Sequence, residues 1–173
     1  MTLDLLTCEA VKLMHKILMW GAEGVSAGEY RTLPAHSGTG TVYPEAEYID
    51  GGMVAVLENF HRDLALVASG ALDKHIMAAR LFYEMIMLHP FQNGNGRLCR
   101  LLVTYALMKA GDPFPVCLSN GHKKSRQHFQ QVLRHADAHV GDVTRLAAYI
   151  LECRHHAWQN FNRNLHYLPG KGC

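Results

Sequence analysis

The sequence predicts a single all-α domain that carries one short β-hairpin. Its 173 residues are enough to bury one substantial core, and they are 49% apolar and 18% charged, as in ordinary globular proteins. Apolar residues recur at helical spacing in six segments. Between the first two of these segments the chain is rich in Gly and Pro instead. The predicted helices span about residues 4–20, 44–67, 71–88, 98–108, 122–136 and 142–162.

The ends of several helices can be justified from local signals. Gly21, the pair Ser69-Gly70 and the segment Ala-Gly-Asp-Pro at 110–113 end three of them. The third helix should stop near Leu88, since the residue before Pro90 is disfavoured in the α conformation. The fourth predicted helix is apolar on nearly every face, which predicts that it forms the buried centre of the bundle.

Two segments fall outside the helical pattern. Residues 21–44 form a long loop, and extended pieces around Gly38 and Gly40 predict a hairpin over about residues 29–44. Long loops in compact domains are often functional. Residues 163–173 are predicted to be a frayed end. No repeat or second domain is evident, so residues 1–173 are expected to form one domain.

Charge and cysteine content restrict the environment and the partners. The formal net charge is only +2, so neither nucleic acid nor a membrane is an expected partner. The five cysteines are an odd number without CxxC spacing, which favours a reducing compartment. The first residues lack the pattern of a secretory signal, and no apolar run approaches membrane-spanning length. A cytoplasmic location is therefore expected.

Residues 89–100 read HPFQNGNGRLCR and lie between two predicted helices. Gly94 and Gly96 permit backbone conformations closed to other residues and let a ligand approach the main chain. Free N–H groups at the start of the next helix, with the helix dipole behind them, attract anions. Arg97 and Arg100 are three positions apart, so both project from one side of the first turns. Two guanidinium groups beside a helix N-terminus suit a di- or triphosphate.

His89 precedes this candidate phosphate site. A neutral imidazole there can accept a proton from an incoming hydroxyl, and a base beside a phosphate pocket is the layout of phosphoryl-type transfer. Each element also has a common structural explanation, because Gly-Asn-Gly is a frequent turn and paired arginines often form surface salt bridges. The order and spacing of all the elements together indicate function.

HPFQNGNGRLCR resembles the signature of Fic-domain proteins, HPFx(D/E)GNGRxxR, at every defined position except one. GEYR at 28–31 resembles the family's GxYR segment before its flap, and TGTVYPEAEYI at 39–49 resembles the end of the flap. The resemblance covers about residues 3–165 in organisation and is specific at 89–100. It implies a Fic-like helical bundle and an enzyme that transfers AMP from ATP to a hydroxyl side chain of a target protein.

The resemblance also implies a role for each matching position of the signature. His89 would deprotonate the Tyr, Ser or Thr hydroxyl of the target, while Pro90 and Phe91 would be structural, with Phe91 packed into the core. The phosphate-binding positions would be Asn93, Gly94, Asn95, Gly96, Arg97 and Arg100, the glycine-containing part forming an anion hole for the α- and β-phosphates and the arginines holding the outer ones.

The flap would pair with an extended segment of the target by strand addition. Its docking positions would be Arg31, Thr39, Gly40, Thr41, Val42 and Tyr43. Phe129 lies in the region where family members place the adenine pocket.

The departure from the signature is Asn93, where most AMP-transferring members have Asp or Glu binding Mg²⁺. A neutral amide oxygen holds Mg²⁺ more weakly than a carboxylate does, so a weak contact, direct or through water, is expected. The family's inhibitory pattern, (S/T)xxxE(G/N), has its nearest match at residues 41–46, inside the flap and with a Pro. It is not accepted as a match. Any inhibition is therefore expected from a separate protein or segment.

Three other interpretations of function stay open. The chain can be a Fic-fold transferase of a different group, such as UMP or phosphocholine, or an enzyme that removes AMP. It can also be a non-enzymatic nucleotide-binding or protein-docking module, weakened at Asn93.

His135 and His139 have the spacing of two zinc ligands on one helix, but no third ligand lies nearby, so a solvent-exposed helix face is the better interpretation. Cys99 is expected to face the core.

Overall fold

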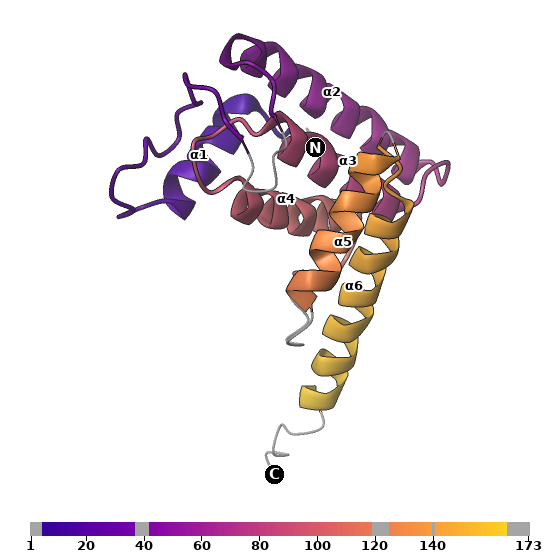
Figure 1. Cartoon of the computed structure of the whole chain (residues 1–173). Helices are drawn as coiled ribbons and strands as arrows, with labels where there is room; N and C mark the ends of the chain where they lie inside the picture. The colour runs from indigo at the N-terminus through magenta and orange to yellow at the C-terminus, as the bar shows by residue number, and fades with distance from the viewer. Residues whose placement is uncertain (1–4, 37–41, 119–124, 140, 166–173) are drawn as a thin grey trace.

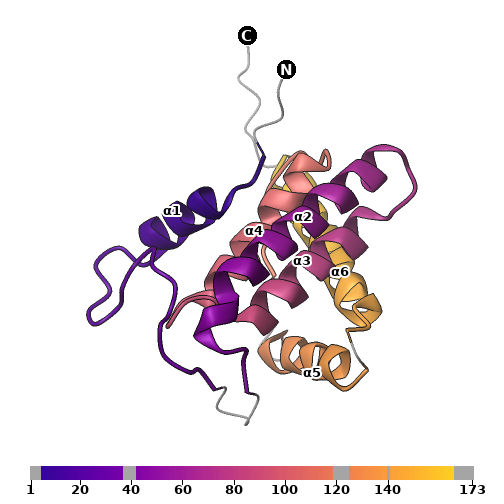
Figure 2. The same ribbon diagram turned by 90° about the horizontal axis from the view of Figure 1, so that it is seen from above.

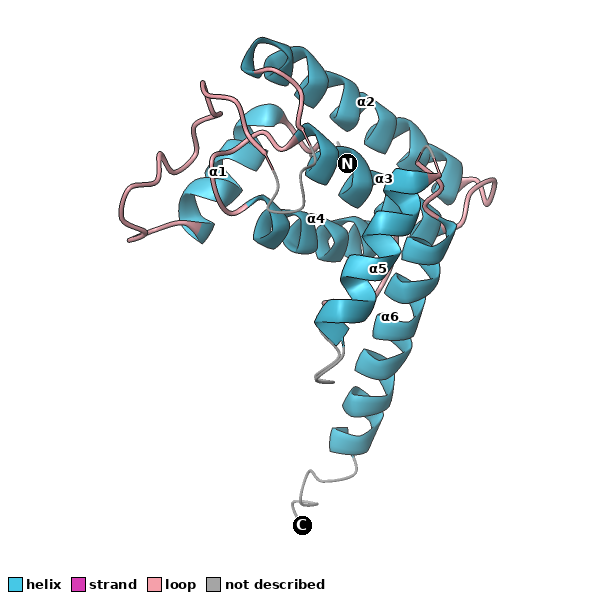
Figure 3. Cartoon of the chain, viewed as in Figure 1, coloured by secondary structure: helices cyan, strands magenta, loops and turns pink. Residues whose placement is uncertain are grey.

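The computed structural model describes residues 5–36, 42–118, 125–139 and 141–165, and these residues confirm the all-α class. Within them there are six α-helices and no β-strand (Figure 3). The helices are α1 (Cys8–Leu18), α2 (Ile49–Ala68), α3 (Lys74–Leu88), α4 (Asn95–Lys109), α5 (Ser125–Ala138) and α6 (Thr144–Leu165), and a 3-10 turn, η1 (Ala46–Tyr48), precedes α2. None of the described helices is long and apolar enough to cross a membrane.

The centre of the bundle is α3, because α2, α4 and α6 all pack against it (Figure 1). Figure 2 shows α2, α3 and α4 side by side, with α1 beside α4. The apolar pattern of residues 98–108 predicted α4 at the centre, and this prediction is wrong in that respect. One face of α4 is fully buried, through Leu98, Leu102 and Ala106, but Leu101 and Met108 on its other face are 41% and 46% exposed.

Several helices begin elsewhere than predicted because a neighbouring side chain or glycine caps them. Asp73 accepts hydrogen bonds from the N–H groups of His75 and Ile76, so α3 starts at Lys74 and not at 71. Similarly, Thr7 caps α1, which therefore starts at Cys8. The Gly-Asn-Gly segment contributes the first turn of α4, three residues before the predicted start at 98.

The last helix is longer than expected. Fraying was predicted from residue 163, but α6 continues to Leu165, and the rest of the predicted frayed end lies outside the described residues. Its final turns extend beyond the other helices (Figure 1). There Trp158 and Phe161 stack on Phe114 with ring centroids 5.7 and 5.2 Å apart. This aromatic contact gives the extension a partner, which a count of polar residues along the segment does not predict.

The predicted hairpin forms no strand in the described residues. One isolated antiparallel bridge joins His36 to Val42, and the N–H of Tyr43 donates to the carbonyl of Ala35 at 3.3 Å. The predicted docking positions Thr39, Gly40 and Thr41 lie outside the described residues. The described residues therefore contain one isolated bridge where the hairpin was predicted, with too few ladder hydrogen bonds to make a strand.

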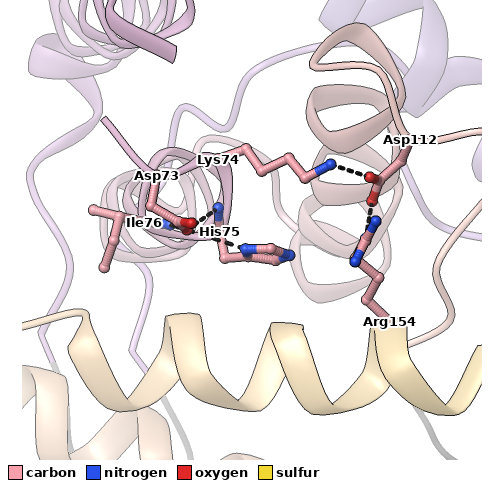
Figure 4. A network of polar contacts seen from close by, with 6 residues as sticks. All are labelled: Asp73, Lys74, His75, Ile76, Asp112 and Arg154. Carbon is pink, nitrogen blue, oxygen red and sulfur yellow. Dashed lines mark hydrogen bonds and ion pairs between the residues drawn. The ribbon is translucent and has the colours of Figure 1, made fainter. Parts of the chain in front are cut away.

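A buried carboxylate ties three parts of the fold together (Figure 4). Asp112 follows α4, and its side chain is only 1% exposed. It pairs with Lys74 at the start of α3 and accepts a hydrogen bond from Nε of Arg154, on α6, at 2.8 Å. Because both partners are cations, the buried charge is compensated. Asp73, close by in Figure 4, is exposed and serves only the helix start and His75.

Candidate active site

The site begins at the turn that ends α3, where His89 has a left-handed backbone, with φ 49° and ψ 56°. No other non-glycine residue of the described chain has a positive φ. A side chain in this conformation costs about 1–2 kcal/mol, so it persists only where surrounding contacts hold it. The N–H of His89 donates to the carbonyl of Met85 at 3.1 Å, which supplies one such contact.

Arg31 supplies the other contacts that hold this turn. It is only 6% exposed, and its Nε donates to the carbonyl of His89 at 2.8 Å. Its backbone N–H donates to the carbonyl of Pro90 at 2.9 Å, and another guanidinium nitrogen donates to the carbonyl of Leu33 at 2.9 Å. Arg31 was predicted to dock a target. The structure gives it a structural role that the sequence did not predict, because it fixes the backbone of the histidine.

The His89 ring is held by two contacts. Nδ1 lies 3.3 Å from the carbonyl of Ile86, and the ring stacks on Tyr43 with centroids 3.9 Å apart and planes inclined by 15°. A carbonyl only accepts, so Nδ1 carries the proton and Nε2 has the lone pair. Burial lowers the pKa of His89, and the Arg31 cation lowers it further, although the Ile86 carbonyl opposes this. The ring is therefore neutral near pH 7, with Nε2 able to accept a proton.

The loop after His89 is clamped by its own side chains. Phe91 is fully buried, as predicted, between the rings of His15 and Tyr30. Asn95 is 3% exposed, accepts from the N–H of Phe91 at 3.0 Å and donates to its carbonyl at 2.6 Å. The carboxamide of Asn95 thus closes the loop, so only its backbone N–H remains for a ligand.

The start of α4 has the features of an anion site. Gly94 caps it at φ 80°, and no described residue accepts from the N–H groups of Asn95 and Gly96. Arg97 and Arg100 are exposed, and no described carboxylate pairs with either. Arg100 lies against Gly96, with a guanidinium nitrogen 3.9 Å from where a Cβ on that glycine would be. Two uncompensated cations and the positive end of the helix dipole attract a polyanion.

Asn93 precedes this candidate anion site. Its carbonyl is used internally, 2.9 Å from Nε2 of His15, while the residue itself is exposed and its carboxamide has no described partner. The amide oxygen is therefore free to face a ligand. The described residues contain no group of three His, Cys, Asp or Glu side chains that could hold a metal ion. His135 and His139 therefore have no third ligand among these residues, and their rings stack with centroids 3.9 Å apart.

A cavity of about 320 Å³ lies on the side of His89 that faces residues 26–36. His89 and Gln92 line one wall, and Glu29, Thr32 and His36 are among the residues of the other. This second wall was not predicted from the sequence. The Gly-rich loop that supplies it is recognisable, but which residues face the histidine depends on contacts across about sixty positions of sequence.

The remaining predicted positions lie at the edge of the site or in the core. Val42 is 69% exposed, at the end of the loop that carries Tyr43. Phe129 packs onto the core, against Phe82 and Tyr149. Cys99 is fully buried, as predicted, and burial raises the pKa of its thiol to about 12, so it is not a nucleophile.

Replacing Gly94 with Ala is expected to destabilise the protein more than replacing Gly70 does. Both glycines have positive φ, 80° and 77°, so each alanine carries a backbone cost of about 1–2 kcal/mol. A Cβ at Gly94 would also lie 2.7 Å from Sδ of Met19, whereas nothing lies within 4 Å at Gly70. Urea unfolding measures both free energies. Equal losses would contradict a tight packing of the loop against α1.

Fold and geometry together define a helical domain with an anion-attracting helix start beside a neutral histidine. The Fic/DOC family model matches residues 5–107, more than half of the chain, so the chain belongs to the Fic/DOC family.

Relatives and solved structures agree with this assignment. The chain is 28% identical, over 148 residues, to proteins called protein adenylyltransferase Fic from Drosophila melanogaster and Drosophila persimilis. The match covers 86% of this chain and 28% and 27% of those proteins, so the chain spans about a quarter of their length.

Two solved structures share the fold. A fragment of Fic-1 from C. elegans matches with a TM-score of 0.78 at 24% identity, over 95% of this chain and 45% of that one. A Fic domain containing signaling protein from Bacteroides thetaiotaomicron matches with a TM-score of 0.66 at 24% identity, over 88% of this chain and 57% of that one. At these identities the likeness concerns the fold.

Proposed function

We propose that this chain is a protein adenylyltransferase, which transfers AMP from ATP to a hydroxyl side chain of a target protein. The observation that carries the proposal is the state of His89. Its Nδ1 is committed to the Ile86 carbonyl, and Nε2 has no described partner. The chain reaches the anion-attracting start of α4 six residues later. The names of the Drosophila relatives agree with this reaction.

The proposed reaction uses the base and the helix start together. The target hydroxyl gives its proton to Nε2 of His89, and its oxygen attacks the α-phosphorus of ATP. The bond from that phosphorus to the oxygen bridging to the β-phosphate breaks, and pyrophosphate leaves. Arg97, Arg100 and the N–H groups of Asn95 and Gly96 would hold the phosphates and offset the charge of the leaving group. These N–H groups are already oriented by the helix.

ATP chemistry of this class uses Mg²⁺, which neutralises phosphate charge when bound. The exposed side-chain amide of Asn93 is suited to be a ligand of such an ion. It is a neutral oxygen ligand, and Mg²⁺ otherwise relies on phosphates and water. Asn93 would therefore hold the ion weakly, directly or through water, without the charge that a carboxylate provides.

The target would dock beside His89. The loop that carries Val42 and Tyr43 ends on the imidazole, through the ring stack of Tyr43. Strand addition along this loop would bring a target segment to the base. The docking roles of Arg31 and of residues 39–43 remain predictions.

The test is transfer of label from ATP marked at the α-phosphate, compared with ATP marked at the γ-phosphate, with and without Mg²⁺. AMP transfer moves the α label alone into protein. Transfer of γ label would overturn the proposal. Label from UTP or a phosphocholine donor in place of ATP would indicate another group, and release of AMP from a modified target would indicate the reverse reaction.

A non-enzymatic module is the second candidate function, and Asn93 is the observation that favours it. The result expected of a non-enzymatic module is ATP binding without transfer of label to the chain itself or to proteins of a lysate. ATP binding is measured separately by calorimetry, so this outcome is distinct from a damaged nucleotide site.

Replacing Asn93 with Glu is expected to raise Mg²⁺-dependent transfer, because a carboxylate binds Mg²⁺ more tightly than an amide does. The residue is exposed, so the larger side chain has room. The measurement is the rate of α-label transfer over a Mg²⁺ titration, with Gln92→Glu, at the exposed neighbouring position, as the matched control. An unchanged rate and an unchanged Mg²⁺ midpoint would show that position 93 does not limit metal use.

A further inference from the structure

His15 lies on the inner face of α1 and is completely buried, although it is 74 positions from His89 in the sequence. Both of its ring nitrogens are used. Nδ1 accepts a hydrogen bond from the N–H of Gly28 at 2.9 Å, and Nε2 lies 2.9 Å from the carbonyl of Asn93. The N–H of Gly28 can only donate, so Nδ1 is unprotonated. Nε2 therefore carries the proton and donates to Asn93.

The same ring touches two more residues of the loop before α4. It stacks on Phe91 with centroids 3.8 Å apart and planes inclined by 10°. A Cβ on Gly94 would lie 3.1 Å from Nε2 of His15, so the backbone of Gly94 packs closely against the edge of the ring. His15 is thus packed against Phe91, Asn93 and Gly94 at once, and none of these contacts belongs to its own helix.

The hydrogen bond to Asn93 fixes more than a carbonyl. The carbonyl of Asn93 and the N–H of Gly94 belong to one planar trans peptide, in which they point in opposite directions. Holding the carbonyl toward α1 therefore directs the N–H of Gly94 away from α1. No described residue accepts from this N–H.

We propose that His15 is a positioning residue for nucleotide binding, which acts through the Asn93–Gly94 peptide to aim the Gly94 N–H at the phosphates. The proposal rests on the proposed function, because it assigns a residue to the same phosphate site. His15 contacts no nucleotide itself. Its part is to select one orientation of a peptide that glycine would otherwise leave free to rotate.

The surroundings of His15 keep it in the neutral form that this arrangement requires. Nδ1 faces the N–H of Gly28, which can only donate a hydrogen bond. A second ring proton would meet that N–H.

Three variants separate positioning from simple packing. His15→Phe keeps the stack on Phe91 and loses both hydrogen bonds. His15→Gln keeps an N–H near the place of Nε2 and so retains a donor for Asn93. His75→Phe is the control, because His75 is a second buried histidine, 7% exposed, on α3 and outside the site. Urea unfolding shows the stability loss of each variant.

The readout is the dissociation constant of ATP for the whole chain, measured by calorimetry. His15→Phe is expected to weaken ATP binding about tenfold, the size of one hydrogen bond, and His15→Gln to recover most of that loss. His75→Phe should lose stability and keep its affinity. Equal ATP affinity in His15→Phe and wild type, or no recovery in His15→Gln, would overturn the proposal and leave the proposed function standing. Absence of ATP binding by the wild type would overturn both.

Discussion

Replacing His89 with Ala is expected to slow AMP transfer by about 10²–10⁴-fold, the usual contribution of a general base, and to leave ATP binding intact. The proposed phosphate-binding groups belong to α4 and its cap, whereas His89 belongs to the turn that ends α3. Chemistry and nucleotide binding should therefore separate. The measurement is the single-turnover rate of α-label transfer, with ATP affinity determined in parallel.

Two control variants make the result specific to the imidazole. His36 lines the same cavity and is exposed, so His36→Ala should keep its rate. His89→Asn retains a residue type that tolerates a left-handed backbone, so it tests whether the loss arises from the ring and not from the turn. A His89→Asn variant that transfers AMP as fast as wild type would exclude His89 as the base.

The pH dependence of the wild type gives an independent check on the base. The pKa of His89 is lowered from its ordinary value near 6.5, chiefly by burial. A base works in its neutral form, so kcat/KM should rise as pH passes upward through this lowered pKa and be level at pH 7. The acid limb should have its midpoint below about pH 6.5. A midpoint well above that value would mean that another group limits the rate.

The local part of the site could be predicted from the sequence. The glycine before α4 and the two arginines of its first turns follow from short-range rules of backbone conformation and helix spacing. The burial of Phe91 follows from the resemblance to the signature. The structure places each of these residues as expected. The signature histidine was also recognised, through its position before the anion site.

The supports of the site could not be predicted, because they come from far along the chain. Arg31 reaches the His89 carbonyl across 58 positions, and His15 reaches Asn93 across 78. A periodic pattern along one helix says which face is buried, but it does not say which partner that face meets. His15 lies four positions after Val11, on the same buried face of α1. A histidine at such a position gives no local signal of its role.

The same limit explains the error about the centre of the bundle. Residues 98–108 are apolar on nearly every face, yet Leu101 and Met108 are exposed, because three other helices surround α3 and not α4. Helix α3 carries Arg80 and Glu84, which lower its apparent hydrophobicity. Both are satisfied by α2, through Asp63 and Asn59 respectively, so polar residues sit at the edge of a central helix.

Replacing Asp112 with Ala is expected to lower the free energy of unfolding by about 3 kcal/mol, since removing one partner of a buried ion pair leaves the others uncompensated. Lys74 and Arg154 would face each other near the end of α4 without their shared carboxylate. Both cations are partly exposed, 22% and 35% at the side chain, so water can relieve part of the repulsion. The loss should appear in urea unfolding as a lower midpoint with an unchanged slope.

Asp73→Ala is the matched control, because it removes a side chain of the same type from the same region of the fold. Asp73 is exposed and caps α3 through the N–H groups of His75 and Ile76, so its loss should cost about 0.5–2 kcal/mol. The double replacement of Lys74 and Arg154 by Met in the Asp112→Leu background removes every charge of the cluster and should recover stability, because an apolar cluster of similar size replaces a buried ion pair at little cost. If Asp112→Ala loses no more stability than Asp73→Ala, the carboxylate does not hold α3, α4 and α6 together.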